Sequence, residues 1–237
     1  MMSEQKSLSP EAQKWLDGQV IFLNKPIGWT SFDLVRKVRY RIRNRFGIKK
    51  IKVGHAGTLD PLATGMMIIC TGKSTKKLVN YQDLGKEYVA GIRFGTTTPS
   101  FDLETEIDAN FSTDQITKES LEQVLYEMVG PQMQVPPLFS AKKIAGRRAY
   151  DIAREGNTVE IKSQAIEIYS LELLSYDLPD IEIRVSCSKG TYIRSLARDL
   201  GLALNSGAHL ISLSRTAIGP HTLDTALDVE DLDNYIK

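Results

Sequence analysis

The chain has 237 residues, 42% of them hydrophobic and 25% charged, which is ordinary for a folded globular protein. This length suits one large domain or two small ones. No apolar run approaches the length of a membrane-spanning helix, and residues 1–17 lack the apolar core of a signal peptide. Cys70 and Cys187 match no metal or redox spacing, so we expect a cytoplasmic protein that does not bind membranes.

Charge is segregated along the chain, although the formal net charge is only +1. Nine basic residues and no acidic residue lie between Arg36 and Lys52, whereas eight acidic residues and one lysine lie between Asp102 and Glu127. Such segregation can present one positive face to a polyanion, although a solvated basic helix is the commoner outcome. Tyr40 and Phe46 within the basic run could be core or stacking residues, and we expect them to be core residues.

Helices and strands are both predicted along the chain. Ser9, Pro10 and Glu11 open a short helix, because a cap residue is followed by Pro at the first helical position. Thr30 or Ser31 caps the next helix, which ends near Gly47. Its apolar residues recur at helical spacing and are Phe32, Val35, Val38 and Ile42. Further helices are predicted from Ser74, over 121–128 and 191–204, and within 224–237. Strands are predicted over 20–23, 66–70, 86–94, 165–177, 181–187 and 209–218.

Residues 131–160 differ in character from the rest, since three prolines are followed by a basic stretch. We interpret residues 131–160 as an irregular, basic excursion from the core, with an insertion at about 137–160 and a short helix over 149–154. There are no repeats or low-complexity linkers. The order of elements therefore predicts a single α+β domain over residues 1–237, with a mixed, mostly antiparallel central sheet flanked by helices.

Asp60 stands out because it lies in a Gly-rich loop between a lysine-rich stretch and an apolar run. Pro61 disfavours a helical conformation at Asp60, while Gly57 and Gly65 permit a tight or left-handed backbone on either side. A loop carboxylate in this setting can be a nucleophile or a general base. The alternative is structural, since an Asp before Pro commonly opens a turn.

Other chemistries are poorly supported by the spacing. Thr71-Gly72-Lys73-Ser74 ends like a phosphate-binding loop, but Met67 stands where that motif requires Gly. The three histidines form no metal-binding pair, and no dinucleotide fingerprint is present. We therefore expect a reaction performed by side chains alone, without a metal or another cofactor.

The segment GHAGTLDPLATGMMIICTGKSTK resembles the catalytic motif of bacterial tRNA pseudouridine synthases of the TruB family. Further blocks agree in order and spacing over about residues 19–220. They are FLNKPIGWTS from Phe22, KEY from Lys86, CSKGTYIR from Cys187, and GAHL from Gly207 with Leu213 and Arg215. The resemblance implies the pseudouridine synthase fold and an enzyme that isomerises uridine in RNA.

The resemblance also implies roles for individual residues. Asp60 matches the nucleophile, Arg194 the arginine that pairs with it, and Tyr88 the tyrosine that stacks on the target uracil. His55 matches a histidine that occupies the space left by the flipped-out bases. The remaining residues, implied to contact the substrate, are Lys25, Tyr192, Leu213 and Arg215. An extended backbone from Tyr192 to Arg194 would place both side chains on one face, whereas a helical one would not.

Two departures from the family pattern stand out. Pro99 occupies the place of a common acidic residue between Thr98 and Ser100, although Asp102 still matches. The small C-terminal RNA-binding domain found in many members is expected to be absent, which would leave more of the RNA binding to the basic helix and the insertion.

We expect the protein to be a monomer that needs no protein partner. It would convert the T-loop uridine at position 55 of tRNA to pseudouridine and bind the T arm. Two alternatives remain: a synthase of the same fold acting on another RNA, and a catalytically silent tRNA-binding module or chaperone.

Overall fold

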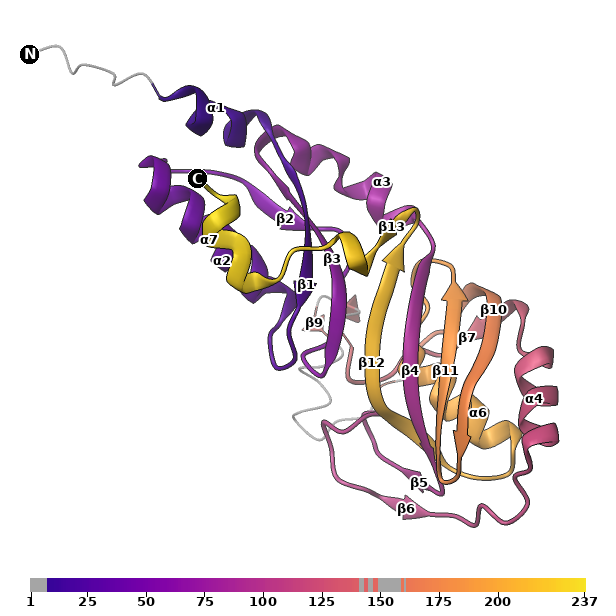
Figure 1. Cartoon of the computed structure of the whole chain (residues 1–237). Coiled ribbons are helices and arrows are strands. Elements are labelled where there is room, and N and C mark those ends of the chain that lie inside the picture. Colours follow the sequence, from indigo (N-terminus) through magenta and orange to yellow (C-terminus); the bar gives the residue numbers. More distant parts are fainter. Residues whose placement is uncertain (1–7, 141–142, 145–146, 149–158, 160) are drawn as a thin grey trace, which may run out of the picture. The chain divides into compact units, whose positions relative to one another are not determined.

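The computed structural model describes residues 8–140, 143–144, 147–148, 159 and 161–237 (Figure 1). The chain forms two compact units. Unit 1 comprises Met1–Leu84 and Arg215–Lys237, and unit 2 comprises Gly85–Ser214. Whether both belong to a single domain stays a prediction.

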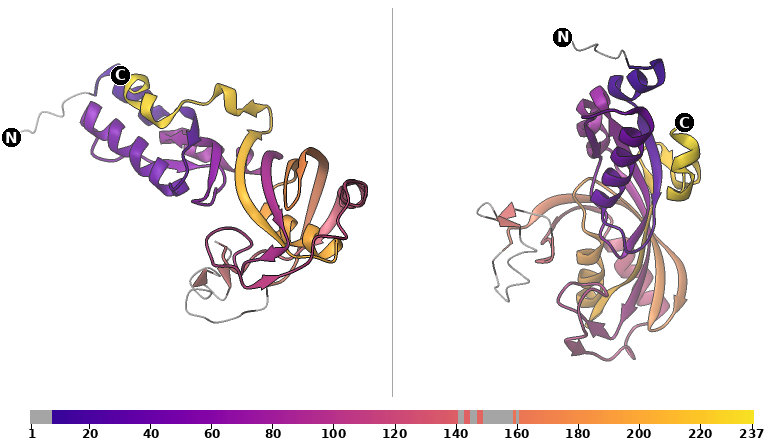
Figure 2. Two further views of the ribbon diagram at one scale, coloured as in Figure 1. Left: turned by 60° about the horizontal axis from the view of Figure 1, so that its bottom comes forward. Right: turned by 90° about the vertical axis from the view of Figure 1, so that its left-hand side faces the viewer.

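In unit 1, strands β1 and β2 each pair antiparallel with β3. A parallel bridge joins Leu23 of β1 to Leu227 in the C-terminal segment. Helices α1 and α2 lie side by side (Figure 2), and the rings of Trp15 and Phe46 are 6.4 Å apart. The elements are α1 (Pro10–Asp17), β1 (Val20–Lys25), α2 (Ser31–Phe46), β2 (Val53–His55), β3 (Ala63–Thr71), the 3-10 helix η1 (Gly72–Lys77), α3 (Leu78–Asp83), β13 (His221–Thr222), the 3-10 helices η2 (Leu223–Thr225) and η3 (Val229–Asp231), and α7 (Leu232–Tyr235).

Local sequence signals explain where the helices of unit 1 begin and end. The Ser9 side chain accepts a hydrogen bond from the Ala12 N–H, which caps α1. Thr30 and Asp33 form a reciprocal capping box at the start of α2. Gly47 ends α2 in the left-handed conformation, at φ 64°.

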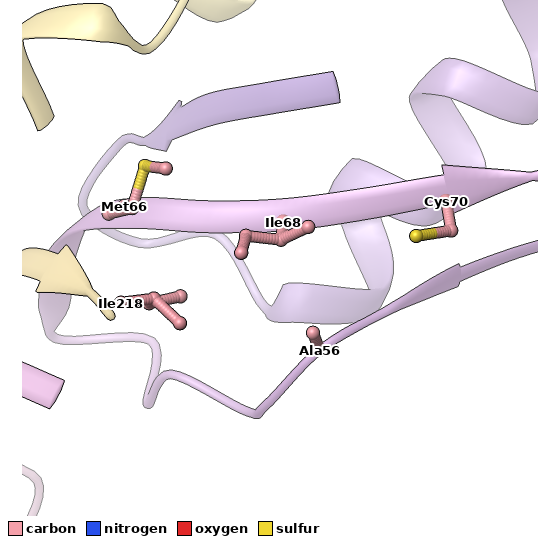
Figure 3. Close-up of a cluster of buried hydrophobic side chains, with 5 residues drawn as sticks. All are labelled: Ala56, Met66, Ile68, Cys70 and Ile218. Atoms are coloured by element: carbon pink, nitrogen blue, oxygen red, sulfur yellow. The ribbon is translucent and has the colours of Figure 1, made fainter. Parts of the chain in front are cut away.

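The core of unit 1 includes a cluster of buried side chains along β3 (Figure 3). Met66, Ile68 and Cys70 occupy alternate positions of this strand. Ala56 and Ile218 complete the cluster from neighbouring segments, and all five side chains are fully buried. This core supports the loop of residues 56–62, which connects β2 to β3.

In unit 2, the strands lie in the order β12-β4-β11-β10-β7 (Figure 1). Helix α6 packs against β4 and α4, and α4 packs against β10 (Figure 1). Strand β12 begins in unit 2 and ends in unit 1. The elements are β4 (Lys86–Phe94), β5 (Thr96–Thr97), β6 (Ala109–Asn110), α4 (Lys118–Glu127), β7 (Gly130–Gln134), β8 (Lys143–Ile144), β9 (Arg147–Arg148), β10 (Gln164–Asp177), β11 (Asp180–Cys187), α6 (Ile193–Ala203) and β12 (Ala208–Ile218).

The predicted class, an α+β fold with a mostly antiparallel sheet flanked by helices, is confirmed. Some details were wrong. The segment from residue 131 is not irregular at its start, because β7 pairs with β10. Pro131 is tolerated there because β7 is an edge strand. Ser74 does not open a helix but lies inside η1, which begins at Gly72. The helix predicted over 149–154 lies outside the described residues.

The buried face of α2 also differs from the prediction. Leu34, Val35, Val38 and Ile42 are buried, whereas Phe32 is 55% exposed and Tyr40 is 59% exposed. Tyr40 is therefore not a core residue. It is two residues from both Val38 and Ile42, about 200° around the helix from each, and so faces away from the core. Phe46 is half-buried against Trp15, as a core residue would be.

Candidate active site

Asp60 lies in unit 1, in the loop that connects β2 to β3. Its carbonyl oxygen accepts a hydrogen bond from the Ala63 N–H at 3.1 Å, which closes a turn with Pro61 at the second position. Gly57 and Gly65 have φ angles of 113° and 107°, so both occupy backbone conformations that side chains disfavour. The turn holds the half-buried Asp60 carboxylate beside the exposed Pro61.

The residue before Asp60 is clamped by the first residue of α2. The buried Ser31 hydroxyl donates to the Leu59 carbonyl at 3.0 Å and accepts from the Leu59 N–H at 2.8 Å. One hydroxyl thereby satisfies both backbone groups of a buried residue. These two hydrogen bonds therefore fix the position of the Asp60 loop relative to the start of α2.

The residue after Asp60 is held by Lys25, at the end of β1. The Lys25 ammonium is fully buried and donates to the carbonyls of Trp29 at 2.6 Å, Pro26 at 3.2 Å and Pro61 at 3.4 Å. The Gly28 N–H also donates to the Pro61 carbonyl, at 2.8 Å. The loop is therefore fixed on both sides of Asp60.

The charge of Lys25 is affected by its burial. Burial lowers the pKa of Lys25 from 10.5 to about 8, and Asp60 opposes this by attracting the ammonium. The nearby Arg215 adds to the lowering through charge repulsion. At pH 7 the side chain still carries its proton, so Asp60 has a buried cation in its surroundings.

Arg215 lies at the point where β12 enters unit 1, and its side chain is almost fully buried. Its Nε donates to the Met66 carbonyl at 2.7 Å, and its Nη2 reaches the Gly57 carbonyl at 3.4 Å. Gly65 permits the close approach, because a Cβ there would lie 2.4 Å from the Arg215 carbonyl oxygen. Arg215 thus connects β3 to the loop that carries Asp60.

His55 ends β2 and precedes the same loop. Burial lowers the pKa of His55 below 6.5, so the imidazole is neutral at pH 7. Within the described part of the chain, its buried Nδ1 makes no hydrogen bond. A buried ring nitrogen without a partner is uncommon and is able to bind a polar group of a ligand.

Arg194 lies in unit 2, in the first turn of α6. Its guanidinium donates to the Phe139 carbonyl at 2.7 Å and to the Ser100 carbonyl at 3.1 Å. Its Nε lies 3.6 Å from the Asp102 carboxylate, and both side chains are buried. The predicted pairing with Asp60 joins residues of different units and stays a prediction.

The segment that contains Pro99 is ordered by hydroxyl groups. Thr98 and Ser100 both donate to the Asp102 carbonyl, at 2.7 and 3.3 Å. The Asp102 carboxylate itself accepts from the Glu104 N–H at 2.9 Å. These contacts hold the Asp102 carboxylate beside Arg194, although Pro99 supplies no carboxylate of its own.

Of the other expected site residues of unit 2, Tyr88 lies on β4, Leu213 on β12 and Tyr192 directly before α6. Tyr88 is 8% exposed and lies on the same side of β4 as the buried Ala90 and Ile92. Leu213 is a half-buried residue of β12. Tyr192 has an extended backbone, but Arg194 is already helical, so the shared face expected from a fully extended segment is not formed.

No residue set in the described ranges points to a metal. Among the residues that the structure describes, His, Cys, Asp and Glu nowhere gather in threes that could hold an ion. Within the same residues, no helix is long and apolar enough to cross a membrane.

Comparison with known proteins decides the family. Residues 43–193 match the model of the TruB family pseudouridylate synthase N-terminal domain. The chain belongs to the TruB family of pseudouridylate synthases. Residues 194–237 match the model of the tRNA pseudouridylate synthase B C-terminal domain. The expected absence of a further RNA-binding domain stays a prediction.

Relatives cover the chain almost completely. A tRNA pseudouridine synthase B from Parabacteroides distasonis is 56% identical over 223 residues, which are 94% of this chain and 95% of the relative. A protein of the same name from Bacteroides fragilis is 57% identical over 220 residues, 93% of this chain and 94% of the relative. As a TruB family member the protein is an isomerase, since a pseudouridine synthase rearranges uridine without adding or removing atoms.

Solved structures confirm the pseudouridine synthase fold. The chain resembles a chain of a Cbf5-Nop10-Gar1 complex, with 30% identity and a TM-score of 0.71 over 95% of this chain. It also resembles a chain of an H/ACA RNP bound to a substrate RNA containing 2'-deoxyuridine, with 26% identity and a TM-score of 0.67 over 98% of this chain. It spans 56% and 60% of those longer chains.

Three residues that position parts of the site were not predicted from the sequence to do so. Ser31 was considered only as a helix cap, and the double hydrogen bond to Leu59 has no signal in local spacing. Asp102 was matched to the TruB family without a role, and its contact with Arg194 spans 92 positions of the chain. Gln134 was not considered, yet its side chain binds both the N–H and the carbonyl of Tyr192.

Proposed function

We propose that this enzyme converts uridine 55 in the T loop of tRNA to pseudouridine, with Asp60 as the nucleophile. The observation that carries the proposal is the fixed position of Asp60, between Leu59 clamped by Ser31 and Pro61 bound by Lys25. A reacting carboxylate benefits from such fixation, because a displacement of about 1 Å can cost about a hundredfold in rate. The names of relatives that are 56–57% identical support tRNA as the substrate.

The reaction needs only side chains and the bound nucleotide. The bond between C1' of the ribose and N1 of uracil breaks, the uracil turns, and a bond forms between C1' and C5. The proton leaves C5 and N1 gains one, so atoms balance without a cofactor. Attack by Asp60 on either the base or the ribose requires its ionised carboxylate.

The remaining site residues receive distinct roles in this proposal. Arg194 is the counter-ion that keeps Asp60 ionised in a water-poor site, and Tyr88 stacks on the target uracil. His55 fills the space that the flipped-out nucleotide leaves, with Tyr192 and Leu213 lining the substrate site. Lys25 and Arg215 act mainly through the loop that carries Asp60, because Lys25 donates to the Pro61 carbonyl and Arg215 donates to the carbonyls of Gly57 and Met66.

The same proposal specifies the partners. The T arm of tRNA is the bound part of the substrate, and the enzyme works in the cytoplasm as a monomer without a protein partner. A synthase acting on another RNA is less favoured, since the relatives that match over 93–94% of this chain carry the tRNA name. A silent tRNA-binding module would not need the clamps on both sides of Asp60.

The test is incubation with unmodified tRNA followed by mapping of pseudouridine at single-nucleotide resolution. We expect wild-type protein to modify position 55 and Asp60→Asn to lose turnover while binding tRNA with similar affinity. Asn is nearly isosteric but cannot act as an anionic nucleophile. Appreciable turnover by the Asn variant, in protein checked for deamidation, would exclude Asp60 as the nucleophile. An inactive wild-type protein that binds tRNA would favour the silent module.

A further inference from the structure

The outward face of α2 carries an exposed aromatic ring among cations. We call Arg36, Lys37, Tyr40 and Arg43 the Tyr40 face. Tyr40 is 59% exposed and points away from the buried side of the helix, so it adds nothing to the core. Arg36 precedes it by four positions and Arg43 follows by three, so both cations are its neighbours on the helix surface.

Two depressions meet at Tyr40 and Arg36. One has a volume of about 520 Å³ and is also lined by Gly28, Trp29, Asp33 and Lys37. The other has a volume of about 290 Å³ and is also lined by Arg39, Arg43 and Asn44. Tyr40 therefore lines both depressions, in which basic residues outnumber the one acidic residue, Asp33, and a planar group has room to lie against its ring.

The arginines of α2 differ in what they already bind. Arg41 pairs with Asp233 at 2.6 Å, and Arg39 donates to the Val53 carbonyl at 3.2 Å, so both brace unit 1. Arg36 pairs with Asp33 at 2.8 Å, but its side chain is 66% exposed. An exposed pair of this kind contributes little, so a phosphate can compete for Arg36.

We propose that the Tyr40 face is a second RNA contact of the enzyme, at which an unpaired base of the bound tRNA stacks on Tyr40 while flanking phosphates bind Arg36 and Arg43. The identity of the RNA rests on the proposed function. Exposed aromatic rings among cations bind unpaired nucleotides in this way, because every base has a face that can stack. The absence of acidic residues between positions 36 and 52 of the sequence favours a polyanion over a protein surface.

The test measures the binding of full-length protein to an unmodified tRNA transcript at several salt concentrations. Tyr40→Ala weakens binding about tenfold, the scale of one lost stacking contact, and Tyr40→Phe stays within about twofold because the ring is kept. Arg36→Gln with Arg43→Gln lowers the slope of log K against log salt by about 1.5, as expected for two lost phosphate contacts. The slope of Tyr40→Ala equals that of wild type.

The matched control is Tyr126→Ala, because Tyr126 is a 78% exposed tyrosine on the helix α4 of unit 2. Its affinity and single-turnover rate equal those of wild type. Wild-type affinity in Tyr40→Ala, or an equal loss in Tyr126→Ala, overturns the inference. An equal loss in Tyr40→Phe and Tyr40→Ala overturns stacking. Failure of wild type to form pseudouridine contradicts the proposed function instead, while the affinities still decide whether Tyr40 contacts RNA.

Discussion

Lys25 shows how one buried residue can support a loop and influence a charge. Its ammonium satisfies three carbonyls, including that of Pro61, so it holds the chain next to Asp60. Burial of a cation is costly unless hydrogen bonds and opposite charge compensate. Here the lowered pKa of about 8 indicates that the compensation is incomplete, even with Asp60 nearby.

The pH dependence of stability follows from this pKa. The unfolded chain keeps Lys25 protonated up to about pH 10.5, whereas the folded chain releases the proton near pH 8. The unfolded state therefore binds more protons between these values, and the contribution of Lys25 to the free energy of unfolding rises with pH across this window. We therefore expect the free energy of unfolding of wild type, measured with urea, to increase relative to that of Lys25→Met between pH 8 and pH 10.

The control for this measurement is Lys50→Met, because Lys50 is exposed. The difference in free energy of unfolding between this variant and wild type should stay constant over the same pH range. A flat difference for Lys25→Met as well would show that the ammonium keeps its usual pKa in the folded protein.

Asp102 is expected to act through Arg194. Its carboxylate is the acidic partner that the structure gives to this buried guanidinium in unit 2, at 3.6 Å. Asp102→Asn keeps a side-chain oxygen for the Glu104 N–H but removes the charge beside Arg194. We expect single-turnover rates to fall about a hundredfold, as for a misplaced reacting group, with tRNA affinity retained.

The comparison for Asp102 is Glu106→Gln, since Glu106 is an exposed acid of the same segment. This variant should keep the wild-type rate. Equal rates in Asp102→Asn and wild type would mean that the carbonyls of Ser100 and Phe139 suffice to position Arg194.

At the scale of elements, two adjacent residues at the start of α2 have different structural roles. Thr30 caps the helix through the reciprocal box with Asp33, and Ser31 binds the backbone of Leu59. The helix therefore positions the loop of Asp60 in addition to covering the sheet. A cap and a loop clamp can be separated experimentally because different side chains perform them.

We expect Ser31→Ala and Thr30→Ala to destabilise the protein for different reasons. Thr30→Ala loses a cap, which costs about 1 kcal/mol, and should leave turnover intact. Ser31→Ala leaves a buried N–H and a buried carbonyl of Leu59 without that hydroxyl, which costs about 1–3 kcal/mol. Its turnover should also fall about tenfold or more, as Asp60 becomes less well fixed. Thermal unfolding and single-turnover rates of both variants test this. Equal turnover rates in Ser31→Ala and Thr30→Ala would contradict the role of Ser31 in fixing Asp60.

At the scale of the whole molecule, the sequence predicts the class of fold and the order of the main elements. Local signals act within a few residues, so the cap at Ser9 was predicted correctly, and Thr30 is the one of the two predicted alternatives that caps α2. The tertiary environment decides what periodicity leaves open: Leu34 rather than Phe32 joins the buried face of α2. The supports of the site, such as Lys25 to Pro61, join residues far apart in sequence, which local patterns do not encode.

Local patterns also do not encode the pairing of Asp60 with Arg194, because these residues are far apart in sequence. This pairing is a proposal about residues of different units. An arginine stays protonated in a buried site and can bridge a carboxylate with two hydrogen bonds, whereas a lysine pairs as a point charge. Arg194→Lys should therefore fold but lose most of its turnover. Arg194→Met should lose still more, because Asp60 would lack its counter-ion.

The decisive measurement is the pH dependence of the single-turnover rate for wild type and Arg194→Met. Loss of a nearby cation raises the pKa of a carboxylate, so the fraction of ionised Asp60 at a given acidic pH falls. The acidic limb of the profile should move to higher pH in Arg194→Met and lie between the two in Arg194→Lys. An acidic limb that does not move, together with an intact rate, would show that Arg194 serves only the Ser100, Asp102 and Phe139 contacts of unit 2.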